Sequence, residues 1–155
     1  MTTKLTTAAA IVVTSAALTA CGSSSSSSST ATAAHHHHAK PRIYTVQLSG
    51  SAETPHGAAQ GAGTAVIAFH GTTKVCWRFA HLHGFSSATF AHIHRGPAGK
   101  SGSIVVPLST ASQLHHRGCV AVPRATVTAI EKDPAGYYVN IHSTTYPGGA
   151  VRAQL

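Results

Sequence analysis

The sequence predicts an all-β fold over residues 40–155, a Greek-key β-sandwich with one short helix. From about Lys40 onward, short apolar runs with β-branched and aromatic residues alternate with polar positions, and Gly or Pro interrupts them roughly every ten residues. Only 9% of the 155 residues are charged, which argues against a helical bundle held together by surface ion pairs. A chain of this length is expected to form one domain of ordinary size.

The expected strands follow one another with a period of two. In "RIYTVQLSG", Tyr44, Val46 and Leu48 share one face, and "GTAVIAFHG" alternates in the same way. In "KVCWRFAHLHG", Val75, Trp77 and Phe79 share one face, and Cys76 lies on the other, as in a strand with one buried face. Further strands are expected in "SATFAHIHRG", "GSIVVPL", "GCVAV", "GYYVNIHS" and "GAVRAQL".

One segment, "PRATVTAIEKDP", has the pattern of a short helix instead. Pro123 is suited to the start of a helix, and Asp133 followed by Pro134 is suited to its end. Val127 and Ile130 would then pack on the sheets.

Residues 1–20 have the pattern of a lipoprotein-type signal peptide. Lys4 precedes an apolar stretch from about Leu5 to Ala17, which is too short for a comfortable transmembrane span. The tetrapeptide "LTAC", ending at Cys21, resembles the bacterial lipobox, in which the cysteine is lipidated and becomes the new N-terminus. A plain signal peptide with a chance cysteine is the alternative.

Residues 21–39 are expected to form a disordered Ser- and His-rich tether. A Ser-rich segment of this kind lets an anchored domain stand off a membrane, which favours lipidation of Cys21. The tether ends in His35–His38, a tract that could collect transition metal loosely or serve only as solvated linker.

With Cys21 assigned to lipid, Cys76 and Cys119 remain. An even pair in an exported chain predicts a disulfide, because exported proteins fold in oxidising compartments. A pair of copper-binding thiolates is the alternative, although no CxxC or CxxxC spacing supports it.

The net charge of +8 comes from 11 Lys and Arg against three acids. These cations form no run and no stripe interleaved with aromatic residues, which argues against nucleic-acid binding. Weak attraction to an anionic envelope surface is a milder consequence of the charge.

Two long motifs carry a family resemblance. "AHIHRGPAG" and "YVNIHSTTYPGGAVRAQL", together with "LSGSAETP", "GAGTAVIAF" and "VCWRF", stand in an order that resembles the CHRD domain, named after the animal protein chordin and abundant in bacterial exported proteins. The resemblance covers about Ile43 to Leu155, with modest departures at "ETPHG" and "AVRAQL". It implies the fold more closely than a biochemical role.

Three histidines are candidate metal ligands. In a strand, His92 and His94 point to the same face, so that their imidazoles could converge on one ion, and His142 could be the third ligand if its strand lies near. This pattern resembles the copper ligands of copper/zinc superoxide dismutases, which also use a Greek-key sandwich. The stretch after the HxH contains no His or Asp, so the zinc-site residues of those enzymes have no counterpart. For the fold as a whole, the strand pattern is compatible with either an immunoglobulin-like or a superoxide-dismutase-like Greek-key sandwich.

Two interpretations of these histidines stay open. They could bind copper or zinc with an open fourth position, oriented by Tyr138 or Asn140, or they could be hydrogen-bonding groups that join loops. A second HxH, His81 and His83, is expected on a solvent-facing strand end, and His115 and His116 are expected in an exposed loop.

No catalytic residue is assigned. Glu53, Glu131 and Asp133 are the chain's only acids, and no Ser-His-Asp order or phosphate-binding glycine loop is present. With so few acids, Glu53 is expected to pair with Arg152 in an internal ion pair or a hydrogen-bonded clamp.

The sequence thus predicts an exported lipoprotein tethered to the outer face of a bacterial membrane. Its domain is expected to be a non-enzymatic binding or envelope module, with an unidentified envelope protein or ligand as partner. A copper- or zinc-binding protein in metal handling or redox defence is the alternative. No motif specifies an oligomeric state.

Lipidation predicts the mass of the mature N-terminus. Mass spectrometry of the membrane fraction should show a chain that begins at Cys21 and carries acyl groups, and Cys21→Ser should release the protein from the membrane because the acyl chains provide the anchoring. An unmodified Cys21, or cleavage at another position, would refute the anchor.

Overall fold

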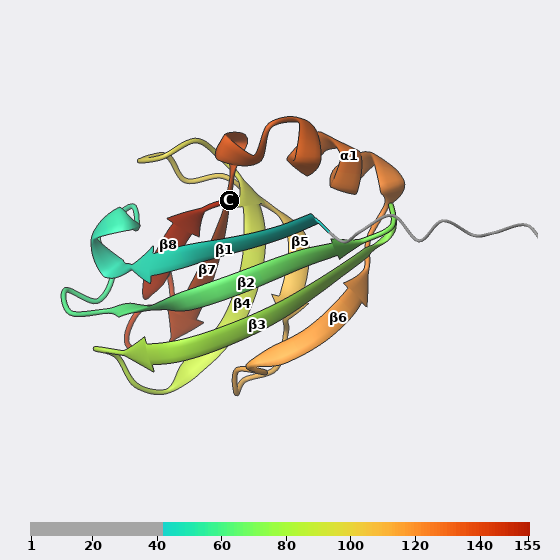
Figure 1. Ribbon diagram of the computed structural model, residues 1–155. Coiled ribbons are helices and arrows are strands. Elements are labelled where there is room, and N and C mark those ends of the chain that lie inside the picture. The colour runs from blue at the N-terminus through green and yellow to red at the C-terminus, as the bar shows by residue number, and fades with distance from the viewer. Residues whose placement is uncertain (1–41) are drawn as a thin grey trace, which may run out of the picture. The chain divides into compact units, whose positions relative to one another are not determined.

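The computed structural model describes residues 42–155 (Figure 1). The signal peptide, the lipidation site and the tether predicted for residues 1–39 lie outside the described residues. Along the described chain the elements are β1 (Arg42–Ser49), η1 (Gly50–Ala52), β2 (Ala62–His70), β3 (Lys74–His83), β4 (Ala88–Arg95), β5 (Ser103–Ser109), β6 (Arg117–Ala121), α1 (Arg124–Lys132), η2 (Pro134–Gly136), β7 (Tyr137–Ser143) and β8 (Val151–Gln154).

The predicted all-β fold with one short helix is confirmed. Helix α1 begins directly after Pro123 and ends before Asp133, and it buries Val127 and Ile130 as its sequence pattern predicts. No helix among the described residues is long and apolar enough to cross a membrane.

The eight strands form one antiparallel sheet with the order β5-β4-β7-β8-β1-β2-β3-β6. Strand β1 pairs with β2 along its whole length, whereas β1 and β8 are joined by a single pair, Ser49 with Arg152. The sheet folds over at this joint, and its halves β5-β4-β7-β8 and β1-β2-β3-β6 form two layers (Figure 1). Strands β5 and β6 also contact each other, so the sheet is nearly closed.

The hydrophobic core lies between these layers. Alternate residues of β2 and β3 are buried, as expected for strands with one face toward a core. On the opposite layer, β4 contributes Ala91 and Ile93, and β7 contributes Val139 and Ile141, all with 0% of their surface exposed. These four residues therefore fix which faces of β4 and β7 point away from the core.

The other face of β4, β7 and β8 is polar, yet most of it is also buried. Six residues share it, and we call this set the polar face: His92, His94, Tyr138, Asn140, His142 and Arg152. Loop segments cover the polar face, chiefly residues 96–102, which hydrogen bond to it at several points. Polar side chains buried in this way need partners, and those partners determine how the histidines are held.

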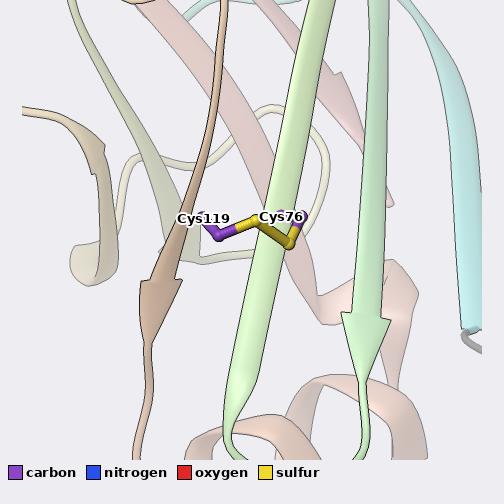
Figure 2. The surroundings of a disulfide bond; sticks show 2 residues. All are labelled: Cys76 and Cys119. Atoms are coloured by element: carbon purple, nitrogen blue, oxygen red, sulfur yellow. A yellow bond between two sulfur atoms is a disulfide. The ribbon is translucent and has the colours of Figure 1, made fainter.

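Cys76 and Cys119 are joined by a disulfide between β3 and β6 (Figure 2). They stand directly opposite each other in the register of the two strands, with a Cα–Cα distance of 4.0 Å. The bond attaches the end strand β6 to the rest of the sheet and leaves neither thiol free to bind copper.

Removing the disulfide should destabilise the domain. In the chain-entropy model, a cross-link between residues 43 positions apart contributes about 4 kcal/mol to the free energy of unfolding. Urea unfolding of the Cys76→Ala/Cys119→Ala variant should show this loss, and reduced wild-type protein should behave like the variant. Equal unfolding midpoints for oxidised wild type and variant would contradict the expectation.

Candidate metal centre

Strand β4 sets the direction of His92 and His94. Because Ala91 and Ile93 point into the core, strand alternation turns the two histidines to the polar face. The ladder between β4 and β5 is irregular at Ala91/His92 and again at Ile93/His94. Irregularities of this kind re-aim side chains, and here they lie beside each of the two histidines.

Strand β7 brings His142 to the same place. His92 stands opposite Asn140 in the ladder between β4 and β7, so His142 is the diagonal neighbour of His92 on the same face. The rings of His92 and His142 have centroids 5.0 Å apart, and those of His92 and His94 are 5.6 Å apart.

The three rings present one nitrogen each to a common point. These ligand atoms lie within 4.8 Å of one another, so that small side-chain movements would bring them to the separation of about 3.4 Å that a tetrahedral ion with metal–nitrogen bonds of about 2.1 Å needs. Within residues 42–155, His92, His94 and His142 are the one group of His, Cys or acidic side chains with this property. The structure therefore brings together the three residues that the sequence singled out.

Backbone carbonyls determine the tautomers of two of these rings. Nδ1 of His94 lies 2.9 Å from the carbonyl oxygen of Gly102, and Nδ1 of His142 lies 2.8 Å from that of Pro147. A carbonyl oxygen can only accept, so each Nδ1 carries the hydrogen and each neutral ring has its lone pair on Nε2. A hydrogen bond from the second ring nitrogen to a carbonyl is the usual way in which a metal-binding histidine is oriented.

Three ring nitrogens are placed to bind a metal ion: Nε2 of His94, Nε2 of His142 and Nδ1 of His92. Nε2 of His94 is buried and has no hydrogen-bond partner among the described residues. Nε2 of His142 lies 3.1 Å from Nδ1 of His92, which donates its hydrogen there in the metal-free protein. An ion bound to these nitrogens would take the place of this hydrogen, and the His92 ring would carry its hydrogen on Nε2 instead, so that the imidazole stays neutral. The residues thus fit a three-imidazole site.

Burial keeps the imidazoles of His92 and His142 uncharged. It lowers the pKa of His92 to about 4, and the charges that His142 and His94 would carry act in the same direction. Burial also lowers the pKa of His142, with its hydrogen bond to Pro147 opposing and His94 adding to the decrease. At neutral pH both rings are therefore neutral, the form that binds a metal ion.

The cluster is open on one side. His94 is 8% exposed, whereas His92 and His142 are only half-buried. Phe90 is 40% exposed and stacks on the ring of His92, with ring centroids 6.4 Å apart and 10° between the planes. A three-histidine centre here would keep a coordination position that an external ligand can reach.

Tyr138 supports His94 from behind. The two rings are parallel within 4°, with centroids 4.8 Å apart, and the Tyr138 hydroxyl accepts a hydrogen bond from the amide of Gly102. Asn140, the other residue expected to orient a ring, makes no contact of this kind, and its Oδ1 is buried with no partner among the described residues.

The expected ion pair between Glu53 and Arg152 is absent. Within residues 42–155, the structure pairs Arg42 with Glu131 instead, and Arg152 donates to carbonyl oxygens. Glu53 is buried close by, and burial raises the pKa of its carboxyl group, with Asn140 and Arg152 opposing the increase. The guanidinium thus forms the hydrogen-bonded clamp that was the alternative to the ion pair.

The other histidines named from the sequence lie outside this cluster. His81 and His83 are exposed at the end of β3, where Nδ1 of His83 bonds to the carbonyl oxygen of His81. His115 and His116 are exposed before β6. Sequence reasoning missed the contributions of Phe90, Gly102 and Pro147, and only the aromatic residue two positions before the HxH carried a readable signal.

Comparisons with known proteins identify one family. The family model described as CHRD domain matches residues 44–155, nearly all of the described chain. No curated protein and no solved structure matches the chain. Domains of this type are in general non-catalytic binding modules.

The depressed pKa of His92 predicts a pH dependence of stability. Unfolded, this ring takes up a proton near pH 6.5, but in the folded protein it resists protonation until about pH 4. The contribution of His92 to the free energy of unfolding should therefore fall as the pH drops from about 6.5 to about 4. Below about pH 4 this ring is protonated in both states, and its contribution no longer changes. We expect His92 to lower the free energy of unfolding by about 1–2 kcal/mol between about pH 6.5 and about pH 4. This is less than the difference between its folded and unfolded pKa alone implies, because solvent screens a half-buried ring.

Urea unfolding in the presence of a chelator measures this dependence. His92→Gln should reduce the slope between these pH values and leave the part that comes from His142, whose pKa burial also lowers. His116→Gln, at an exposed position, should leave the slope unchanged. The same slope in His92→Gln and wild type would show that His92 is not the group responsible.

Proposed function

Because the chain belongs to the CHRD domain family, we propose that it is an exported, non-enzymatic binding module that holds one copper or zinc ion through His92, His94 and His142. The observation that carries this proposal is the convergence of three imidazole nitrogens, two of them with tautomers set by carbonyl oxygens. Neutral imidazole suits both ions.

The unpartnered Nε2 of His94 favours a metal over a purely hydrogen-bonding role. If the rings only joined loops, each buried nitrogen would be expected to have a partner. Leaving one buried acceptor without a partner costs about 1–3 kcal/mol. A bound ion would give this nitrogen its partner and would also use the lone pair of His142.

The donor set also ranks the two ions. Imidazole ligands bind Cu²⁺ more tightly than Zn²⁺, so copper is expected to displace zinc when both are present. When bound, the ion supplies a Lewis-acidic centre with one accessible position, and copper would add redox capacity. The chain's own residues hold the ion, keep the rings of His92 and His142 neutral and exclude water from the His94 side.

We further propose that the module is attached to the outer face of a bacterial membrane through acylated Cys21. The signal-like residues 1–20, the lipobox-like "LTAC" and the Ser-rich residues 21–39 support this placement. The disulfide between Cys76 and Cys119 supports an oxidising compartment.

Metal stoichiometry tests the proposed function. The full chain should be purified without an added tag from an oxidising compartment, with His35, His36, His37 and His38 replaced by serine so that this tract adds no signal. We expect one copper or zinc ion per chain by elemental analysis, with a lower dissociation constant for Cu²⁺ than for Zn²⁺ in chelator competition. Each of His92→Ala, His94→Ala and His142→Ala should weaken binding about 100-fold, since one of three ligands is lost.

The control is His116→Ala, which removes an exposed imidazole outside the cluster and should leave the affinity unchanged. Finding no stoichiometric metal after incubation with either ion would overturn the proposed metal site. Unchanged affinity in a folded His142→Ala variant would do the same.

A further inference from the structure

Arg152 is the largest side chain with less than 2% of its surface exposed in the described chain. Burial of a guanidinium costs several kcal/mol unless its donors are paired, and a carboxylate is the usual partner. Here, no carboxylate of the described residues lies within ion-pair distance of Arg152. Its partners are three neutral oxygens: the carbonyls of Lys100 at 2.9 Å and Pro97 at 2.8 Å, and Oε1 of Gln154 at 3.0 Å.

These contacts hold segment 96–102 against the polar face. Arg152 bonds the carbonyls of Pro97 and Lys100 within the segment, and Nε2 of Gln154 bonds the carbonyl of Gly96 at its beginning. The segment ends at Gly102, which lies so close to β4 that an added Cβ would stand 1.6 Å from the carbonyl oxygen of Arg95. Only glycine therefore fits this approach.

Gly102 also contacts His94, one of the three proposed metal ligands. Its carbonyl accepts the hydrogen bond from Nδ1 of His94, and its amide donates to the Tyr138 hydroxyl at 3.2 Å. The position of this carbonyl depends on the segment that Arg152 holds in place.

A second route from Arg152 to His94 runs through Tyr138. The guanidinium carbon lies 3.3 Å from the centroid of the Tyr138 ring, a close cation–π contact. The other face of this stack is completed by His94, whose ring is parallel to that of Tyr138. Arg152, Tyr138 and His94 thus form three successive layers.

We infer that Arg152 is a positioning residue of the metal centre, which fixes the tautomer and orientation of His94 through Gly102 and Tyr138. This explains why a buried guanidinium pairs with main-chain carbonyls of one loop. Outer residues that orient a metal-binding histidine typically change metal affinity 10- to 100-fold when they are replaced. The inference rests on the proposed metal function for this last effect, whereas the effect on the His94 tautomer does not require a metal.

The test compares Arg152→Lys with wild type, again in the full chain with the His35–His38 tract replaced by serine. Lysine keeps the charge but lacks the planar fork and the stacking surface. Long-range ¹H–¹⁵N NMR of the metal-free proteins reports the tautomer of His94. We expect Nδ1–H in wild type, a mixture of tautomers in Arg152→Lys, 10- to 100-fold weaker Cu²⁺ binding and an altered Cu²⁺ electron paramagnetic resonance spectrum.

Two further variants keep the test decisive. Arg78→Lys changes an exposed arginine on β3 and should match wild type in every measurement. Tyr138→Phe keeps the aromatic stack but removes the acceptor of the Gly102 amide, so we expect about 3- to 10-fold weaker Cu²⁺ binding. This variant tests the route through the Tyr138 hydroxyl, which unchanged tautomer and affinity would overturn.

If Arg152→Lys does not fold, Arg152→Met replaces it, because methionine keeps an unbranched apolar stem but has no donor for the carbonyls of Pro97 and Lys100. A folded Arg152→Met with the tautomer and affinity of wild type would overturn the inference.

The outcomes separate the two proposals. A wild type that binds metal, with a folded Arg152→Lys that has the same tautomer, affinity and spectrum, overturns the role of Arg152 and leaves the metal function intact. A wild type that binds no metal overturns the metal function, and the NMR comparison then still decides whether Arg152 sets the His94 tautomer.

Discussion

The packing of Ala91 and Ile93 between the two layers is the constraint on which the rest of the structure depends. Both side chains are fully buried, so the residues between and after them must face the other way. A shift of β4 by one residue would place His92 and His94 in the core and expose the apolar pair. The hydrophobic core and the histidine cluster therefore require the same register, and a change that shifts one disrupts the other.

Because loops cover the polar face, their main-chain carbonyls become the hydrogen-bond partners of its side chains. In many sandwiches the outer face of a sheet meets water, but here the loops supply main-chain oxygens that pair with buried side chains. The carbonyls of Gly102 and Pro147 each hold a histidine, and those of Pro97 and Lys100 hold Arg152. Because these partners are uncharged, they orient the imidazoles without adding a negative charge that would favour protonation of the rings.

Much of the fold follows from local signals in the sequence. The period of two marks β2 and β3, and Pro123 and Asp133 mark the ends of α1. The HxH spacing also places His92 and His94 on one face. The approach of His142 to His92 depends on the pairing of β4 with β7, which brings together residues 50 positions apart in the sequence. No local pattern encodes this pairing. The carbonyls could not be predicted either, because every residue type has one. Of the two interactions expected for Arg152, the described residues show the hydrogen-bonded clamp and not the ion pair with Glu53, because main-chain oxygens compete for the guanidinium.

The long separations within the polar face determine when the site can form. His92 and His142 are 50 positions apart, and Arg152 bonds to Pro97 across 55 positions. Contacts of this range carry a larger loop-closure entropy than local ones, and the histidine cluster can assemble only once β4 and β7 have paired. A chain cut between β5 and β7 would retain the HxH but lack the third imidazole and the arginine. Loading with metal would therefore report that the whole domain is intact.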